Sequence, residues 1–288
     1  NEMWQSDMLV GPWLPDPKRP GKKRRCYLYA FLDDHSRLVL DGRFSFKGDL
    51  PALELVMRRA IQKYGQPKSV YYDNGQVYRS RHMKQILGTV GVHRLVFTQP
   101  YRPQGHGKIE AFNRRVRRDF LAELKASPIK TLDELNEAFL AWVDVEYNQA
   151  VHTETGRSPL DRWRDAIDDV RYADEERLRQ AFLWREKRTA DKSGLVSLLA
   201  VRYQVSPDLA GRRVEMRYDP EALEEVEIWV DGGFRERVRR FHVHADRRPH
   251  ARRADDDGPP AASPVKDKQP SADWLGHLVE RRSRETFV

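Results

Sequence analysis

Residues 68–75 have the sequence KSVYYDNG, a short hydrophobic run that ends in the acid Asp73 and a turn-forming Asn-Gly pair. Before this run, apolar residues between 53 and 61 recur at helical spacing, and Gly-Gln-Pro at 65–67 ends that helix. After it, residues 80–90 have a helical pattern and residues 92–98 are strand-like. The alternation predicts a sheet with helices packed on it. It also places Asp73 at a strand end, where ligands of such sheets gather.

Three strand-like runs precede this unit, at residues 1–10, 26–32 and 37–46. A turn-like cluster that begins with Asp33 and Asp34 separates the second run from the third. Residues 11–25 are rich in Pro, Lys and Arg and are expected to form a loop. Successive short strands favour an antiparallel meander, so the fold class is α/β with a mixed sheet and flanking helices.

The remainder of the chain divides by pattern. Helical patterns cover residues 108–125, 131–147 and 172–187, and Thr131 with Glu134 predicts a capping box for the second. Short β-like runs separated by Gly, Asp and Pro follow, and after them a polar segment with little to bury. We therefore expect a core domain at 1–170, a helical linker at 171–194, a small all-β barrel at 195–244, and a disordered tail with a short helix at 245–288.

Composition narrows the class of protein. The 288 residues carry a net charge of +8, which favours a polyanionic partner, nucleic acid first, although an arginine-rich composition without that meaning is equally compatible. The sequence has no apolar run long enough to span a membrane. Its single cysteine, Cys26, excludes an intramolecular disulfide and fits a reducing compartment.

Three acids stand out by position. Asp7 lies inside the first strand, Asp73 ends the fourth, and Glu110 lies in the first turns of the helix that follows a Gly-rich loop. An acid in an apolar strand costs roughly several kcal/mol unless it is paired or binds metal. Carboxylates on separate elements suit a pair of divalent ions that act on a phosphodiester. The alternative for Glu110 is a solvated acid near a helix N-terminus, where acids are favoured.

The helix around Glu110 has two distinct faces. Ile109, Phe112, Val116 and Phe120 form one apolar stripe, and His106, Glu110, Asn113 and Arg117 form the stripe beside it. One face is therefore expected to pack on the sheet. Its neighbour then presents Glu110 beside amide and cationic groups that suit DNA phosphates.

Five segments carry a resemblance to a known family. They are WQSDMLVG, YLYAFLDDHSRLVLDGRFS, SVYYDNGQVYRS, TQPYRPQGHGKIEAFNRRVRRDF and YNQAVHTETGRSPLDRW, in order from residue 4 to residue 163. With them the sequence resembles the retroviral-integrase superfamily of transposases, whose catalytic core has an RNase H-like fold and a D, D, E triad. Thirty-six residues separate Asp73 from Glu110, close to the spacing of that family. The segment VSLLAVRYQVSPDLAGRRVEMRYDP is similar to the β-barrel that follows the core in phage Mu-type transposases.

The resemblance implies roles for individual residues. Asp7, Asp73 and Glu110 would bind Mg²⁺ or Mn²⁺, as two ions, and would be the catalytic residues. Asp33 is the next candidate if Asp7 is wrong, although in the family Asp33 and Asp34 belong to a hairpin. The implied DNA contacts are Lys108, Asn113, Arg114, Arg117, Gln104 and His106. Asn74 and Gly105 lie in segments that border the site in relatives.

The function that the resemblance implies is DNA transposition or integration, by strand cleavage followed by strand transfer. The expected partners are transposon-end and target DNA, further copies of the chain on DNA, and an AAA+ ATPase that contacts the C-terminal tail in some subfamilies. The expected location is the bacterial cytoplasm, near the nucleoid. Two alternatives remain: an RNase H-like nuclease that cuts without joining, and a domesticated, inactive DNA-binding scaffold.

Overall fold

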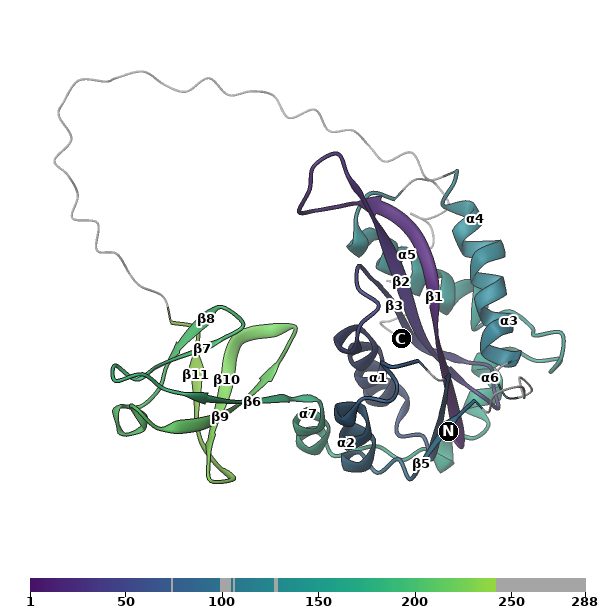
Figure 1. Cartoon of the computed structure of the whole chain (residues 1–288). Helices are drawn as coiled ribbons and strands as arrows, with labels where there is room; N and C mark the ends of the chain where they lie inside the picture. Colours follow the sequence, from purple (N-terminus) through teal and green to yellow (C-terminus); the bar gives the residue numbers. More distant parts are fainter. Residues whose placement is uncertain (74, 99–104, 106, 127–128, 242–288) are drawn as a thin grey trace, which may run out of the picture. The chain divides into compact units, whose positions relative to one another are not determined.

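The computed structural model describes residues 1–73, 75–98, 105, 107–126 and 129–241. The chain forms two compact units, Asn1–Phe182 and a second that begins at Leu183 (Figure 1). Among the described residues, no helix has the length and apolar character that crossing a membrane requires.

The first unit is built on a five-stranded sheet with the order β3-β2-β1-β4-β5. The strands are β1 (Met3–Pro15), β2 (Lys23–Asp33), β3 (Val39–Ser45), β4 (Ser69–Tyr72) and β5 (Arg94–Phe97). Strands β1, β2 and β3 pair antiparallel, whereas β1, β4 and β5 pair parallel. The mixed sheet predicted from the sequence is confirmed, and β1 is the strand at which its two halves meet.

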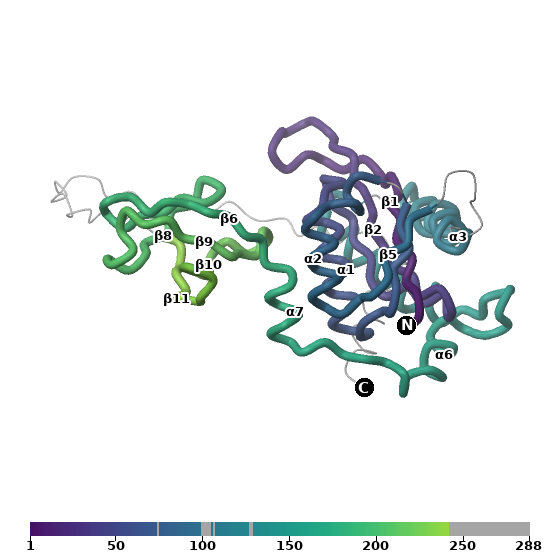
Figure 2. Tube along the Cα trace, turned by 60° about the horizontal axis from the view of Figure 1, so that its bottom comes forward, coloured from purple at the N-terminus to yellow at the C-terminus, as the bar shows by residue number. Residues whose placement is uncertain are grey.

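Helices cover both faces of this sheet. They are α1 (Leu50–Tyr64), α2 (Arg81–Thr89), α3 (Gly107–Arg115), α4 (Leu121–Glu123), α5 (Leu132–Trp142), α6 (Pro159–Arg164) and α7 (Glu175–Phe182). Figure 2 shows α1 and α2 on one side of the strands and α3 on the other. Each side has its own core, because residues that alternate along a strand point to opposite faces. Trp4 and Phe31 are buried with α1 and α2, whereas Leu9 and Leu28 are buried against α3 and α5.

The ends of the helices follow local capping chemistry. The Asp49 side chain accepts a hydrogen bond from the backbone N–H of Ala52 at the start of α1, and Gly65, with φ of 79°, ends that helix. At the start of α5, Thr131 and Glu134 form the capping box that the sequence predicted. These caps satisfy backbone N–H and C=O groups that a helix leaves without partners.

The helix expected at 108–125 is present as one continuous segment, but its hydrogen-bonding pattern changes from α-helical to π-helical and back. Helix α3 ends at Arg115, a π-helical turn covers Val116–Phe120, and α4 follows. The predicted apolar stripe is confirmed, because Ile109, Phe112, Val116 and Phe120 are all fully buried or nearly so. A second π-helical turn, Val143–Tyr147, extends α5 in the same way. Such turns insert one residue per turn and re-aim the side chains that follow.

The prediction of a loop at residues 11–25 is corrected. Both strands continue into this segment, where Trp13, Leu14 and Pro15 pair with Arg25, Arg24 and Lys23. A register shift between Val10 and Trp13 lets the hairpin continue, since Pro12 has no N–H to give to the ladder. Proline and charge made the segment look irregular, but both are typical of an edge hairpin that extends beyond its sheet.

The second unit is all-β. Its four-stranded sheet has the order β11-β10-β9-β6, formed by β6 (Trp184–Thr189), β9 (Arg213–Asp219), β10 (Ala222–Val230) and β11 (Gly233–Arg239). A two-stranded sheet, β7 (Leu195–Leu198) with β8 (Val201–Gln204), packs on the same core. A backbone bridge between Tyr203 and Arg240 connects the two sheets, so the unit is a small, partly closed β-structure.

The expected helical linker at 171–194 is also corrected. Helix α7 ends at Phe182, and β6 pairs with β9 over its whole length. The charged run WREKRT contains residues that are common in helices. Its burial alternates as in a strand, since only Trp184 and Glu186 are partly covered. Pairing with β9 therefore overrides local propensity. The predicted disordered tail and its short helix lie outside the described residues.

Candidate functional site

Asp7 lies in the middle of β1 and faces the α3 side of the sheet. Its neighbours Ser6 and Leu9 are buried, and Asp7 itself is half-buried. Its Oδ1 accepts a hydrogen bond of 2.7 Å from the backbone N–H of Met8. Its Oδ2 accepts one of 2.9 Å from Nδ2 of Asn113 on α3. The charge inside this strand is therefore solvated by N–H donors, as a carboxylate in such a position requires.

Asp73 follows β4, and the register of the sheet brings it beside Asp7. The parallel pairing of β1 with β4 ends at Ser6 and Tyr72, so Asp7 and Asp73 are the next residues on the two strands. Residues that are in register on parallel neighbours point to the same face. The Oδ1 atom of Asp73 accepts a hydrogen bond of 2.9 Å from the N–H of Gly75, which fixes the carboxylate in a tight turn.

A buried tyrosine supports the convergence of the two aspartates. Tyr78 is 2% exposed and stacks on Tyr72, with ring centroids 4.4 Å apart. Burial raises the pKa of the Tyr78 hydroxyl well above its ordinary value. The negative charges of Asp7 and Asp73 raise it further, and the Ser6 hydroxyl opposes them. Tyr78 therefore keeps its proton beside both carboxylates.

Gln5 connects β1 to the start of α3. It is 1% exposed, and its Oε1 accepts a hydrogen bond of 3.2 Å from the N–H of Ile109. Its Nε2 donates to the carbonyl oxygen of Gly105 at 2.9 Å and to Oδ1 of Asp34 at 2.7 Å. The side chain of Gln5 thus satisfies polar groups at the N-terminus of the helix and fixes that end against the strand that carries Asp7.

Glu110 lies in the first turn of α3 and is exposed. Asn113, three residues further on, lies on the same side of the helix and contacts Asp7. The helix face that carries Glu110 is therefore the face turned toward Asp7. The structure thus places two of the predicted ligands side by side and the third on the adjoining helix.

The donor set fits a divalent cation, although the three carboxylates do not close on one point. Within the described residues, no three His, Cys, Asp or Glu side chains lie close enough to hold a metal ion. Carboxylate oxygens are the ligands that Mg²⁺ and Mn²⁺ prefer, and two of them are fixed at neighbouring strand positions. A rotation of the Glu110 side chain is the kind of adjustment that ligand binding brings about.

The predicted DNA contacts divide into four groups. Arg114 on α3 and Arg117 in the π-helical turn after it are exposed, as expected for phosphate contacts. Asn113 is buried and bonds Asp7, so its role in the structure is to position the acid. The Nζ of Lys108 donates to Oδ2 of Asp34 at 2.6 Å, an ion pair that the sequence did not predict. Gln104, His106 and Asn74 lie outside the described residues.

Asp33, the alternative to Asp7, has a structural role. Its Oδ2 accepts hydrogen bonds from the backbone N–H of Ser36 at 2.8 Å and from the Ser36 hydroxyl at 2.7 Å. The side chain is almost fully buried and closes the turn between β2 and β3. Its geometry therefore favours Asp7 as the acid of the site.

Sequence reasoning did not single out Gln5 or Tyr78, and it placed Asp34 in a hairpin without predicting its contacts with Gln5 and Lys108. A signal existed for Gln5, because it is a polar residue on an otherwise buried stretch of β1. None existed for Tyr78, whose position depends on the loop after β4 folding back over the sheet. Long-range contacts of this kind leave no periodic pattern in a sequence.

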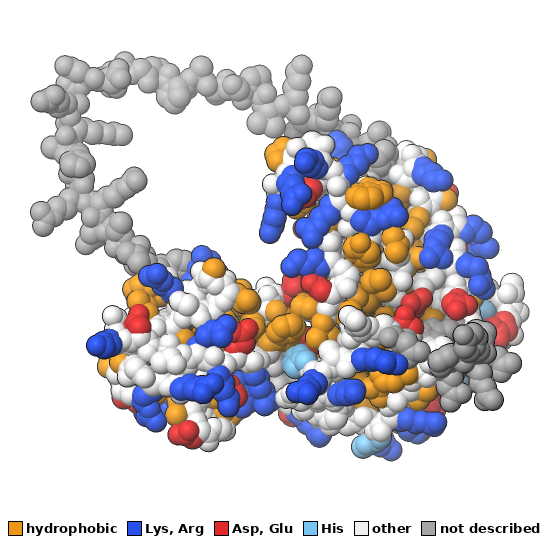
Figure 3. All heavy atoms as spheres, in the orientation of Figure 1, with side chains coloured by type: hydrophobic (Ala, Val, Ile, Leu, Met, Phe, Trp, Pro, Cys, Tyr) orange, Lys and Arg blue, Asp and Glu red, His pale blue; other side chains and the backbone are white. Residues whose placement is uncertain are grey.

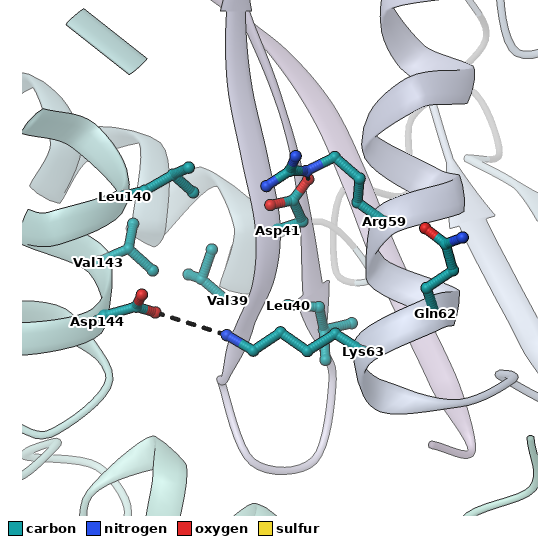
Figure 4. Close-up of a pocket in the computed structure, with 9 residues that line it drawn as sticks. All are labelled: Val39, Leu40, Asp41, Arg59, Gln62, Lys63, Leu140, Val143 and Asp144. Carbon is teal, nitrogen blue, oxygen red and sulfur yellow. Dashed lines mark hydrogen bonds and ion pairs between the residues drawn. The ribbon is translucent and has the colours of Figure 1, made fainter. Parts of the chain in front are cut away.

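The structure also has a pocket away from these acids. Its volume is about 340 Å³, and its walls come from β3, α1, α5 and the π-helical turn after α5. Figure 4 shows Lys63 reaching toward Asp144, and Asp41 facing Arg59. Burial raises the pKa of Asp41 to about 6, against the opposing charge of Arg59. The pocket contains none of the predicted catalytic residues.

Family models match along most of the described chain. Two that are described as integrase core domain match residues 1–103 and residues 93–159. One that is described as Mu transposase, C-terminal, matches residues 179–237. The boundary between the models lies close to the boundary between the two structural units.

Curated relatives include mobile-element and viral proteins. The transposase for transposon Tn552 of Staphylococcus aureus is 29% identical over 57% of this chain and 37% of that protein. The Gag-Pro-Pol polyprotein of sheep pulmonary adenomatosis virus is 24% identical over 60% of this chain and 10% of that protein. The chain thus spans little more than a third of the first relative and a tenth of the second.

Solved structures with a similar fold include viral integrases. The HTLV-2 integrase catalytic core domain in complex with magnesium has a TM-score of 0.42 and 20% identity, over 56% of this chain and 95% of that one. A simian T-cell lymphotropic virus intasome in complex with a PP2A regulatory subunit has a TM-score of 0.49 and 17% identity, over 83% of this chain and 78% of that one.

Proposed function

The chain belongs to the integrase core family, and from this premise we propose that it is a DNA transposase that cleaves DNA strands and transfers them. One observation carries the proposal. The parallel register of β1 and β4 sets Asp7 beside Asp73, and Asn113 brings the Glu110 face of α3 against Asp7. Two carboxylates thus lie side by side where β4 ends, and the third lies on the helix that packs against them, which supports phosphodiester chemistry with divalent ions.

In this proposal Asp7, Asp73 and Glu110 hold Mg²⁺ or Mn²⁺, as two ions. When bound, the ions would make an oxygen nucleophile reactive and would stabilise the leaving oxygen. The chain's own residues prepare the site. Asn113 and the N–H of Met8 orient Asp7, the N–H of Gly75 orients Asp73, and Gln5 fixes the helix that carries Glu110.

The reaction that we propose has two steps. Water attacks the phosphodiester at the end of the element, the bond to the 3′ oxygen breaks, and a free 3′-hydroxyl remains. That hydroxyl then attacks a phosphodiester of the target strand, which joins the two DNAs and releases a new 3′-hydroxyl. Neither step forms a covalent bond between protein and DNA. Arg114 on α3 and Arg117 in the π-helical turn that follows it are exposed and are suited to hold DNA phosphates.

The partners in this proposal are the ends of the element, the target DNA and further copies of the chain, because joining requires two ends held together. Contact with an AAA+ ATPase stays a prediction, since it falls on residues 245–288, outside the described ranges. A position in the bacterial cytoplasm near the nucleoid is likewise a prediction.

A strand-transfer assay tests the proposal. The full-length protein is incubated with pre-cleaved transposon-end DNA, a supercoiled target and Mg²⁺, beside Asp7→Asn, Asp73→Asn and Glu110→Gln. Glu123→Gln is the matched control, because Glu123 is an exposed acid further along the same helical segment. We expect joined product from the wild type and the control, and a loss of roughly 100-fold or more in the three variants.

Each other outcome identifies an alternative. Strand transfer by Asp73→Asn at the wild-type rate contradicts the assignment of the site. Nicked target without joined product favours the nuclease, which shares the three acids. DNA binding without chemistry in the presence of cognate ends favours an inactive scaffold. Calorimetry with Mn²⁺ gives a second readout, since Asp7→Asn with Asp73→Asn should abolish binding of the ion.

A further inference from the structure

A hairpin arm extends from the sheet at a distance from the predicted acids. The ends of β1 and β2 form it, and the turn between them is closed by backbone hydrogen bonds from Asp16 N–H to the Lys22 carbonyl at 2.8 Å and from Lys22 N–H to the Arg19 carbonyl at 3.1 Å. Figures 1 and 2 both show this turn projecting beyond the helices. We call residues 13–25 the basic arm.

The arm carries a large excess of positive charge. Its cations are Lys18, Arg19, Lys22, Lys23, Arg24 and Arg25, and its acid is Asp16. The Asp16 carboxylate accepts a hydrogen bond from the N–H of Lys18 within the turn. In the part of the chain that the structure describes, none of the six cations forms an ion pair with a carboxylate. Figure 3 shows blue side chains gathered over this tip.

The arm differs from the rest of the unit in the number of unpaired cations that lie together in one short segment. Some exposed arginines elsewhere are paired, as Arg118 is with Asp119 and Arg157 is with Asp165, whereas Arg114 and Arg117 form no ion pair within the described residues. Six like charges within eight residues repel one another, and none of them is paired with a carboxylate among the described residues. A polyanion that binds the arm would offset it.

Aromatic rings hold the two innermost arginines in place. The guanidinium of Arg25 lies 5.0 Å from the ring centroid of Trp13, its cross-strand partner, and that of Arg24 lies 5.5 Å from the ring of Phe46. Trp13 is 56% exposed, and Val10 on the same strand is 43% exposed. Guanidinium groups stacked on rings keep their N–H donors at the edge, where they are available to phosphate oxygens.

We propose that the basic arm binds the phosphate backbone of duplex DNA on one side of the reaction site. Clustered unpaired cations and an exposed tryptophan suit a sugar-phosphate surface, and the paired turn presents them in a fixed geometry. An acidic protein segment is the competing partner. The arm favours DNA because all six of its cations lie within residues 18–25, in the turn and on β2, beside the exposed ring of Trp13.

The strand that carries Asp7 also fixes how far away the arm acts. Pro15 lies eight residues beyond Asp7 on β1, a length of about 26 Å at roughly 3.3 Å per residue. That length corresponds to about eight base pairs of B-form DNA. The arm should therefore contact phosphates within about one helical turn of the scissile bond. This distance rests on the proposed function, whereas the binding itself does not.

A binding experiment tests DNA binding by the arm separately from the distance at which the arm acts. The Glu110→Gln protein is used so that binding is measured without cleavage or joining of the DNA. It is titrated with a fluorescent duplex of about 30 base pairs, roughly three helical turns, at several salt concentrations. The arm variant carries Lys18→Gln, Arg19→Gln, Lys22→Gln and Lys23→Gln. The matched control carries four charge-neutralising changes at other exposed positions, Lys84→Gln, Arg94→Gln, Lys125→Gln and Lys130→Gln.

We expect the arm variant to bind roughly 10- to 100-fold more weakly near 0.1 M salt, and its slope of log Kd against log salt to fall by about two to four. The control variant should change both the affinity and the salt slope by less than the arm variant does. The Trp13 side chain is exposed, and a Trp13→Ala variant should also bind DNA more weakly. Equal affinities and slopes for the arm variant and the control overturn the proposal. Displacement of DNA by polyglutamate at equal charge concentration overturns DNA as the partner.

A footprint then tests the distance. Hydroxyl-radical protection on transposon-end DNA should include phosphates about eight base pairs from the joining position in the wild type and lose them in the arm variant. If strand transfer occurs but this protection is absent, the arm proposal fails and the proposed function stands. If the arm variant loses affinity while no variant or wild type performs chemistry, the proposed function fails and the arm stands.

Discussion

Asn113 donates a hydrogen bond of 2.9 Å from its Nδ2 to Oδ2 of Asp7, and this contact joins α3 to the middle of β1. It is one turn away from Glu110 and is made by a side chain that is 5% exposed. Asn113 is thus neither a phosphate contact nor a packing residue. It sets the distance between the strand and the helix that carry two of the three acids.

Replacing Asn113 with Ala should lower strand transfer by roughly 10-fold or more, because a hydrogen bond to a charged group contributes about 1.5–3 kcal/mol. The loss should appear in the rate of joining rather than in DNA affinity. Single-turnover assays beside anisotropy titrations measure both. Ala111→Ser, an exposed change on the same helix, is the control. A folded Asn113→Ala protein that joins DNA at the wild-type rate would show that the contact is incidental.

Gly42 on β3 should not tolerate a methyl group. A Cβ there would lie 2.8 Å from Cε1 of Phe139, whose ring packs against Phe44 at a centroid distance of 5.3 Å. We expect Gly42→Ala to destabilise the protein by about 1–3 kcal/mol, since overpacking forces neighbours off their rotamers. Urea unfolding measures the change.

Gly88 is the matched control for this substitution. It lies in α2, and a Cβ there would meet no atom within 4 Å. Gly88→Ala should therefore stabilise the protein by about 0.5–1 kcal/mol, because alanine loses less entropy in a helix. Combining Gly42→Ala with Phe139→Leu should lessen the cost of the first change. Equal effects of the two glycine substitutions would contradict the packing around Phe139.

Asp41 should make stability depend on pH. Burial raises its pKa from 3.8 to about 6, so the folded protein holds this proton more tightly than the unfolded chain does. The associated stability is fully present below pH 3.8 and is lost as the pH rises through about 6.

The free energy of unfolding of the wild type should fall, relative to Asp41→Asn, by up to about 1.4 kcal/mol per pH unit across this window. Urea titrations at pH values near 4, 5, 6 and 7 test this. Asp144→Asn, on the opposite wall of the same pocket and more exposed, should leave the slope unchanged. Parallel curves for the wild type and Asp41→Asn would contradict the raised pKa.

The thiol of Cys26 should be inert in the folded protein. Burial raises its pKa to about 11, and the side chain is 0% exposed on the α5 side of β2. Because the thiolate is the reactive form, a disulfide reagent at pH 8 should label the native protein only as fast as it unfolds. Unfolding the protein in denaturant should make one thiol per chain available to the reagent. Rapid labelling without denaturant would contradict this burial.

The sequence alone predicted the elements whose patterns are local. The mixed sheet, the end of α1, the start of α5 and the apolar stripe of α3 all follow from periodicity and capping residues. It misjudged residues 11–25 and 183–194, where proline or charge suggested a loop and a helix. In both segments a partner strand supplies the hydrogen bonds, and a partner strand is not visible in a local pattern.

The candidate site divides in the same way. Asp7, Asp73 and Glu110 were identified by their places on elements and by resemblance, and these are properties of the sequence. The register that sets Asp7 beside Asp73, and the contact of Asn113 with Asp7, were decided by the tertiary structure. The physical reason is that a one-residue shift in a parallel pair would turn one carboxylate to the other face, and only the packing of the whole sheet fixes that register.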